Sequence, residues 1–131
     1  MIIADTSIWI EFLKGNASYF EVFALMVEEK KIYVLGCIFG ELLQGSKNEK
    51  EIKILQEYWQ TLPKINEQYL WIQAGILSAK EKLYTKGVGL IDAVILQAAR
   101  NYKYKIWTLD KKLIKCLDKT EYFEQSTEEA E

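Results

Sequence analysis

Three short runs of consecutive apolar residues stand out along the chain, and each predicts a buried β-strand. The runs lie in MIIAD (residues 1–5), IYVLG (residues 32–36) and KIWTLD (residues 105–110). Their apolar character is continuous rather than alternating, which is typical of strands covered on both faces in a parallel sheet. Residues 62–66, around the only proline, and residues 120–124 are weaker candidates. We therefore expect a central parallel sheet of about five strands.

The segments between the apolar runs carry the spacing of helices. Apolar residues recur every three or four positions in residues 37–44, 49–59 and 67–84. Ser18 is expected to cap a further helix that continues to Lys30, with Glu21 as its capping-box partner. Strands that alternate with helices predict an α/β fold, an α/β/α sandwich with right-handed crossovers and a Rossmann-like architecture.

The size and composition of the chain indicate one folded unit. Of its 131 residues, 50% are hydrophobic and 13% are aromatic, which is enough to build a core. We expect residues 1–124 to form a single domain and the acidic residues 125–131 to form a disordered tail. The N-terminus lacks the basic start of a signal peptide, and no apolar run is long enough to span a membrane. We therefore expect a cytoplasmic protein.

The absence of histidine limits the chemistry that the chain can perform. It excludes a Ser-His-Asp triad, a Cys-His pair, a pair of RNA-cleaving histidines and a zinc site with histidine ligands. Cys37 and Cys116 lie far apart outside any C-x-x-C pattern, and we interpret them as buried, reduced thiols. The net charge of -2, with Arg100 as the only arginine, excludes a polybasic nucleic-acid binder but not a local basic patch. Catalysis must therefore rest on carboxylates, lysines, hydroxyls or metal-bound water.

Four acidic residues stand at the ends of the predicted elements. Asp5 and Asp110 directly follow two of the strands, and Glu41 lies in the helix after the second strand. Asp92 opens the helix of residues 89–100, GLIDAVILQAAR, which is otherwise almost wholly apolar. In a parallel α/β sheet, the carboxyl ends of the strands meet at one edge, where function gathers. We therefore expect the four acids to converge there.

Helix capping is the alternative interpretation of these acids. Asp5, Asp92 and Asp110 each stand at the start of a helix, where aspartate is a favoured N-cap. Glu41 is expected to be solvated, as most glutamates in the middle of a helix are. A cap can also bind a metal, because a helix N-terminus favours an ionised carboxylate. Clustered carboxylates raise each other's pKa unless a cation joins them, and an oxygen-rich set of this kind suits Mg²⁺ or Mn²⁺.

Four segments that contain these acids resemble, in order, the four acidic motifs of PIN domains. They are DTSIWIEFLKG, GELLQG, GLIDAVILQAA and WTLDKKL, and the resemblance covers Met1 to about Leu117. Compact chains of this length are most similar to the VapC-type ribonuclease toxins of prokaryotic toxin–antitoxin pairs. The resemblance implies a catalytic quartet that binds Mg²⁺ or Mn²⁺ and consists of Asp5, Glu41, Asp92 and Asp110.

The resemblance also implies the reaction, which is endonucleolytic cleavage of single-stranded or looped RNA. One or two metal ions would activate a water for attack on phosphorus and neutralise the leaving oxygen. Thr6, Ser7 and Thr108 match polar positions that line such sites. Lys111 and Lys112, beside the last acid, are candidates to bind RNA, and the alternative is that they are solvated surface lysines.

Two protein partners follow from the same resemblance, a second copy of the chain in a homodimer and a cognate antitoxin. The C-terminal segment of the antitoxin would block the acidic site, often with a basic side chain. An apolar groove for this segment is expected from six residues near the N-terminus, Ile8, Trp9, Phe12, Leu13, Phe20 and Phe23. Ordinary core packing is the alternative for these six residues.

Other families with an aspartate after the first strand fit less well. A haloacid dehalogenase phosphatase needs a second aspartate two residues later, where this chain has Ser7. A response-regulator receiver domain needs an acidic pair near its start, and this N-terminus supplies only Asp5. Two alternatives stay open: a housekeeping RNA-processing nuclease of the PIN family, and a non-catalytic interaction module whose acids only cap helices.

Overall fold

The strands form a small parallel sheet between helices. The computed structural model describes residues 1–125, so all of the predicted tail except Gln125 lies outside the described part. The sheet has the order β2-β1-β3 and consists of β1 (Ile2–Ala4), β2 (Ile32–Tyr33) and β3 (Lys105–Trp107). Both neighbours run parallel to β1, and Ile3 pairs with Tyr33 on one side and with Ile106 on the other. The predicted α/β fold with a parallel sheet is therefore confirmed.

The prediction of about five strands is wrong, because the two weaker candidates each make only one bridge. Val34 pairs with Lys64 beyond β2, and Ile106 pairs with Tyr122 beyond β3, both in parallel. Pro63 accepts a hydrogen bond from Val34 but has no N–H with which to extend the ladder. Both segments therefore lie along the edges of the sheet without becoming strands.

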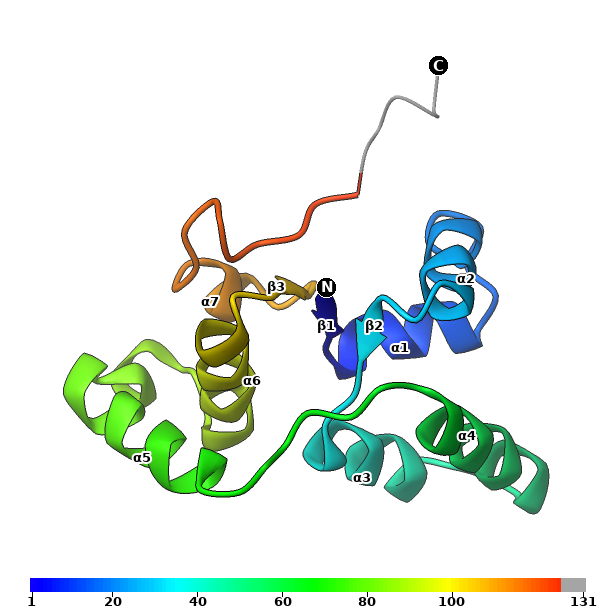
Figure 1. Ribbon diagram of the computed structural model, residues 1–131, viewed down its shortest axis with the longest axis horizontal. Helices are drawn as coiled ribbons and strands as arrows, with labels where there is room; N and C mark the ends of the chain where they lie inside the picture. The colour runs from blue at the N-terminus through cyan, green and yellow to red at the C-terminus, as the bar shows by residue number, and fades with distance from the viewer. Residues whose placement is uncertain (126–131) are drawn as a thin grey trace.

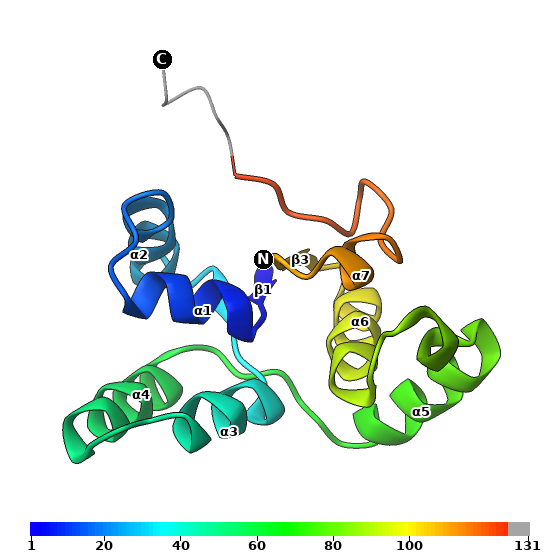
Figure 2. The same ribbon diagram turned by 180° about the vertical axis from the view of Figure 1, so that it is seen from behind.

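Helices cover the sheet from both sides. Within residues 1–125 they are α1 (Thr6–Leu13), α2 (Phe20–Glu28), α3 (Gly36–Gln44), α4 (Glu49–Thr61), α5 (Leu70–Glu81), the 3₁₀-helix η1 (Leu83–Lys86), α6 (Leu90–Tyr102) and α7 (Lys111–Ile114). Figures 1 and 2 show α5 and α6 on one side of the strands and α1 and α2 on the other, with α3 beside α4. In this described part, no helix has the length and apolar character needed to cross a membrane.

Two predicted helix boundaries are wrong, and in each case the backbone turns at another residue. Ser18 does not cap α2, which starts after Tyr19, because the side chain of Asn16 accepts the N–H of Ser18 in a separate turn (3.0 Å). The helix predicted over residues 67–84 is interrupted between α5 and η1 by Lys82, whose φ of 53° is left-handed. A residue in that conformation cannot continue a right-handed helix.

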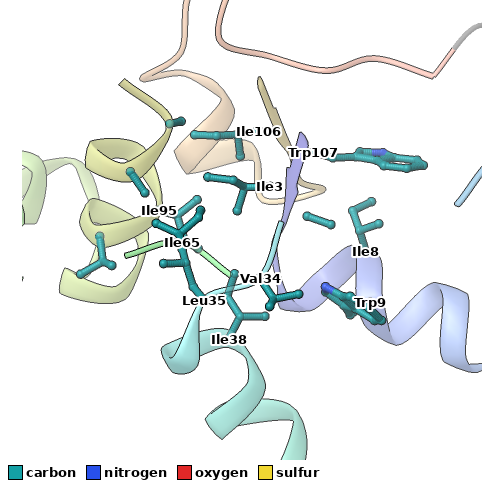
Figure 3. Packing of buried hydrophobic residues seen from close by; sticks show 14 of the residues in the cluster. Ile3, Ile8, Trp9, Val34, Leu35, Ile38, Ile65, Ile95, Ile106 and Trp107 are labelled. Atoms are coloured by element: carbon teal, nitrogen blue, oxygen red, sulfur yellow. The ribbon is translucent and has the colours of Figure 1, made fainter. Parts of the chain in front are cut away.

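The apolar runs of the strands are buried from both sides, as their continuous pattern predicts. Ile3 and Ile106 point toward α6, where Ile95 lies, whereas Trp107 points to the side of α1 and Ile8 (Figure 3). All five side chains are buried, and burial stabilises the fold by about 1.5–3 kcal/mol for each such side chain. The ends of β1 and β3 are therefore firm supports for the residues that follow them.

The predicted apolar groove near the N-terminus is wrong in its original form, because most of it is core. Four of its six residues are buried, namely Ile8, Trp9, Phe12 and Phe23. Trp9 also packs edge-on against Phe39, with 5.0 Å between the ring centroids. Only Leu13 and Phe20 of the six keep a large exposed fraction, 41% and 44%. Core packing therefore explains the other four.

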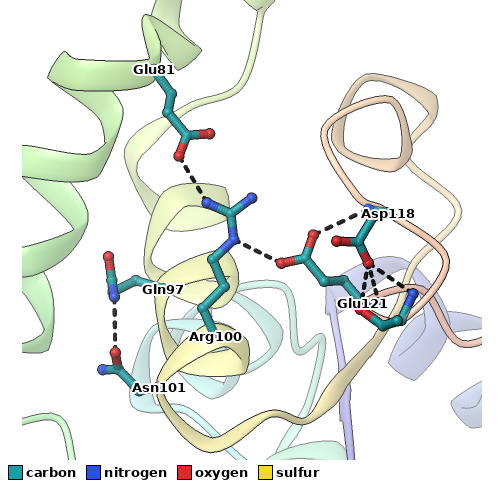
Figure 4. Close-up of polar contacts among 7 residues, drawn as sticks. Glu81, Gln97, Arg100, Asn101, Asp118 and Glu121 are labelled. Carbon is teal, nitrogen blue, oxygen red and sulfur yellow. Dashed lines mark hydrogen bonds and ion pairs between the residues drawn. The ribbon is translucent and has the colours of Figure 1, made fainter.

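Arg100 in α6 joins three parts of the chain through ion pairs (Figure 4). Its Nη1 lies 2.9 Å from the carboxylate of Glu81 in α5, and its Nε lies 2.7 Å from that of Glu121. Glu121 precedes the bridge of Tyr122 to β3, and its side chain also accepts the N–H of Asp118 (3.1 Å). Charge-assisted hydrogen bonds of this length are stronger than neutral ones. They hold the last described segment against α6 and the edge of the sheet.

Candidate active site

The four predicted acids line one cavity of about 270 Å³. Asp5 comes from the end of β1 and Asp110 from the end of the loop after β3, whereas Glu41 comes from α3 and Asp92 from the first turn of α6. The other residues that line the cavity are Thr6, Ser7, Gly89, Ile91 and Ile95. Four segments that are distant in sequence therefore meet at the carboxyl end of the sheet.

Asp5 is held by hydrogen bonds on both carboxylate oxygens. It is 6% exposed and caps α1, because its Oδ1 accepts the N–H groups of Ser7 (3.0 Å) and Ile8 (3.3 Å). The hydroxyl of Ser7 donates to the same oxygen, and the hydroxyl of Thr108 donates to Oδ2. Burial raises the pKa of Asp5, and these hydrogen bonds oppose that rise because they favour the ionised carboxylate.

The hydroxyls of Ser7 and Thr108 also connect the loops that follow β1 and β3. Ser7 Oγ accepts the N–H of Leu109 (3.1 Å), and Thr108 Oγ1 accepts the N–H of Asp110 (3.0 Å). Because each hydroxyl oxygen receives a backbone proton, its own proton is directed at Asp5. Thr108 is 1% exposed and does not line the cavity, so it acts through the two aspartates that it connects.

Asp110 and Asp92 both stand near helix starts, but only Asp110 is a cap. Its Oδ1 accepts the N–H groups of Lys112 (2.9 Å) and Leu113 (3.4 Å) at the start of α7. The N-cap of α6 is Gly89, and Asp92 lies inside the first turn. The capping interpretation is therefore confirmed for Asp5 and Asp110 and wrong for Asp92. Asp92 instead accepts the N–H of Gly89 from the third position of α6, where an acid is favoured, and it also lines the cavity.

Glu41 depends on a residue that the sequence did not single out. Its own Oε1 accepts the hydroxyl of Thr6 (2.7 Å), and its side chain is exposed as predicted. The helix that carries it, α3, begins at Gly36, whose N–H donates to Glu67 (2.7 Å). An added Cβ at Gly36 would lie only 3.1 Å from that carboxylate. Because Glu67 is 31 residues away, no local pattern identifies it as the partner of this helix end.

The pKa of Asp92 shows that the four carboxylates share one electrostatic environment. Burial raises this pKa, and the charges of Asp110, Asp5 and Glu41 raise it further, to about 6. A hydrogen bond from the N–H of Gly89 opposes the rise. A carboxylate whose pKa is raised by three like charges in a cavity is typical of a site that gathers a cation.

Sequence comparison agrees with this geometry. The model of the PIN domain family matches residues 2–117, which include all four acids. The chain belongs to the PIN domain family. No curated protein matches it in sequence. PIN domains are generally nucleases and typically depend on divalent metal ions, so the family indicates a nuclease-type function with a nucleic-acid substrate.

The candidate ligand atoms in this PIN domain are carboxylate oxygens, the type of ligand that suits a hard divalent cation. Carboxylate oxygens are the ligands that Mg²⁺ and Mn²⁺ prefer. Within residues 1–125, no three acidic or cysteine side chains are drawn together closely enough to hold an ion. Oδ1 of both Asp5 and Asp110 is committed to a helix cap. The carboxylate of Asp92 and the second oxygen of Asp110 can therefore move toward a metal without loss of a cap.

The two lysines predicted to bind RNA lie at the start of α7 in this PIN domain. Lys111 and Lys112 directly follow Asp110, and both are exposed. Neither side chain lines the acidic cavity. The structure therefore places them beside the candidate active site and not inside it.

The cysteines take no part in the site chemistry. Cys37 and Cys116 are free and partly buried, which agrees with their interpretation as reduced thiols. Burial and the charge of Glu67 raise the pKa of Cys37 to about 12. The Cys37 thiol therefore stays protonated at neutral pH and is a poor nucleophile.

Proposed function

We propose that this PIN domain is a Mg²⁺- or Mn²⁺-dependent endoribonuclease that uses Asp5, Glu41, Asp92 and Asp110. The raised pKa of Asp92 supports the proposal most, because three other carboxylates cause part of the rise. Repulsion of this kind is relieved when a cation binds. In the rival interpretation Asp92 only accepts the N–H of Gly89 at the start of α6, and this does not explain why four carboxylates line one cavity.

The acids have different roles in the proposed reaction. When bound, the metal supplies an activated water and neutralises charge on the leaving oxygen. Asp5 is fixed by its hydrogen bonds and defines where the ligand oxygens lie. Asp92, whose charge is repelled by the other three acids, would bind the metal directly from the first turn of α6. Asp110 and Glu41 each keep one oxygen on a protein donor and offer the other to the site.

An apolar groove beside the acidic cavity supports a role as the toxin of a VapC-type toxin–antitoxin pair. The groove has a volume of about 450 Å³ and shares Thr6 and Glu41 with the acidic cavity. Its apolar lining comes from α1, α3 and α4 and consists of Ile10, Leu13, Leu42, Ile54 and Leu55. An antitoxin segment with apolar side chains in this groove and a basic side chain among the acids would fit both surfaces at once. This second surface favours the toxin over a housekeeping nuclease.

An exposed face of α5 supports the proposed homodimer. Ile72 and Ile76 are 67% and 51% exposed and lie one turn apart on α5, and Tyr69, which directly precedes the helix, is 71% exposed. Grouped apolar side chains of this size are typical of contact surfaces. In size-exclusion chromatography with light scattering, the parent is expected at twice the mass of one chain, and the Ile72→Glu variant at the mass of one. A monomeric parent would contradict the dimer.

Cleavage of RNA by the purified chain tests the nuclease. A set of structured and single-stranded RNAs is incubated with Mg²⁺ or Mn²⁺ and then with EDTA, and an Asp92→Asn preparation is treated in parallel. We expect cleavage that requires the metal and is lost in the variant. Equal cleavage by both preparations would reveal a contaminating ribonuclease, and an inactive parent over the whole set would contradict the proposal.

A further inference from the structure

Gly87 provides a surface on which the side chain of Lys112 lies. Gly87 has a φ of 79°, in the left-handed region, and ends the 3₁₀-helix η1. A Cβ added at this position would lie 2.9 Å from Cδ of Lys112, 3.3 Å from its Nζ and 3.4 Å from its Cε. The end of the Lys112 side chain, including its ammonium, therefore lies on a backbone surface that has no side chain. A lysine stem commonly lies along the protein surface while its ammonium stays in water, and here the surface under it is the bare backbone of Gly87.

Lys112 thereby connects the segment before α6, the helix that carries Asp92, with the start of α7, which Asp110 caps. Its backbone N–H donates to Asp110 (2.9 Å), and its side chain lies on Gly87, two residues before the cavity-lining Gly89. Among the described residues, the Lys112 ammonium forms no ion pair. Its positive charge has no ion-pair partner there, and it is held against Gly87, between the start of α7 and the segment before α6, outside the lining of the acidic cavity.

We propose that Gly87 and Lys112 form a seat for one phosphate of the RNA substrate, an inference that rests on the proposed nuclease function. Four carboxylates repel a phosphodiester, so a substrate gains from a fixed positive charge at the edge of the site. Lysine binds phosphate as a point charge, and its flexible side chain loses conformational entropy when it is fixed. Contact with Gly87 removes part of that freedom before RNA arrives. Lys111, the adjacent lysine, lacks this contact within the described chain.

The salt dependence of RNA binding tests the seat. A fluorescent single-stranded RNA is bound to the Asp92→Asn chain at fixed Mg²⁺, where cleavage is expected to be absent, and then to the same chain with one further change. Loss of one phosphate contact lowers the slope of log affinity against log salt by about 0.7 for single strands. With Lys112→Gln, affinity is therefore expected to fall about 2.6-fold less than in the reference between about 50 and about 200 mM salt.

Two matched variants separate the seat from general charge. Lys111→Gln removes the same charge one residue away and is expected to keep the reference slope. Gly87→Asn keeps Lys112 but fills the seat, and asparagine tolerates a positive φ better than other side chains. It is expected to lower the slope as Lys112→Gln does. Thermal melts confirm that each variant is folded.

The outcomes separate this inference from the function on which it rests. A reference slope in Lys112→Gln, or an equal loss in Lys111→Gln, would overturn the seat and leave the nuclease proposal intact. A reference chain that does not bind this RNA would overturn the seat, whereas the nuclease proposal is overturned only if the parent chain cleaves none of the RNAs in the metal-dependent assay.

Discussion

Asp5 and Asp92 face the same cavity but are held in opposite ways. Asp5 accepts hydrogen bonds on both oxygens and is almost fully buried. Asp92 is only partly buried, and the hydrogen bond that lowers its pKa, from the N–H of Gly89, does not offset burial and three like charges. The candidate site thus has a fixed half after β1 and β3 and an adjustable half on α3 and α6. Such a site can close on a cation without a change in the core.

Replacement of Asp92 by asparagine should have the largest effect, with opposite signs for activity and stability. Cleavage is expected to fall by more than about 100-fold, because loss of a direct metal ligand exceeds the about 10–100-fold cost of losing its outer hydrogen-bond partners. Without metal, the variant should melt at a higher temperature than the parent, since a repelled carboxylate becomes neutral. Calorimetry in EDTA measures this, and a lower melting temperature would show that Asp92 is not repelled.

Replacement of Thr108 by valine should break the fixed half. Valine keeps the shape but leaves the N–H of Asp110 and Oδ2 of Asp5 without their partner. The free energy of unfolding is expected to fall by about 1–3 kcal/mol, and Mn²⁺ affinity to fall by about 10–100-fold. Urea unfolding and calorimetric titration with Mn²⁺ measure the two effects. Thr108→Ser should restore both, and a valine variant with parental metal affinity would rule out a positioning role.

Stability without metal should depend on pH through the adjustable half. The pKa of Asp92 is about 6 in the folded chain. In the unfolded chain, where burial and the charges of the other three acids no longer act on it, the pKa is near 3.8. The folded state therefore binds the proton more tightly, and this stabilisation is lost as pH rises from about 4 to about 6. Because Asp92 is partly exposed, we expect the loss to be at most about 1–2 kcal/mol. Urea unfolding of the parent minus that of Asp92→Asn isolates it, and a flat difference would contradict the assignment.

The same threonine-to-valine change at Thr6, the hydrogen-bond donor to Glu41 of the adjustable half, should have the smallest effect. Thr6 donates one exposed hydrogen bond to Glu41. Its loss in Thr6→Val is expected to change the free energy of unfolding by no more than about 0.5 kcal/mol. Urea unfolding beside Thr108→Val gives the contrast directly. A comparable loss in both variants would erase the distinction between the two halves.

The sequence revealed the site better than it revealed the sheet. Asp5 and Asp110 were recognisable because each ends an apolar run whose burial on both faces fixes where the strand stops. The number of strands at the edges of the sheet was overestimated. Val34 and Ile106 each pair with a neighbouring segment through one bridge only, and composition does not reveal how many bridges form. The supports of the site, such as Glu67 on Gly36, join residues that are distant in sequence and have no local pattern.

Helix ends were hard to predict for a related reason. Lys82 and Lys103 adopt left-handed conformations at the ends of α5 and α6, and Lys30 does so just beyond α2. Glycine or asparagine is the usual residue there, so a lysine gives no stop signal in the sequence. A lysine does complement the negative end of the helix, which offsets part of the conformational cost.

Arg100 is the only arginine in the chain, so a reagent that modifies arginine reports directly on its ion pairs with Glu81 and Glu121. An arginine-selective dicarbonyl reagent would modify only this residue, and the modification would be faster when the ion pairs to the two carboxylates are broken. The modification rate would therefore record how often the last described segment leaves the edge of the sheet, with no engineered label.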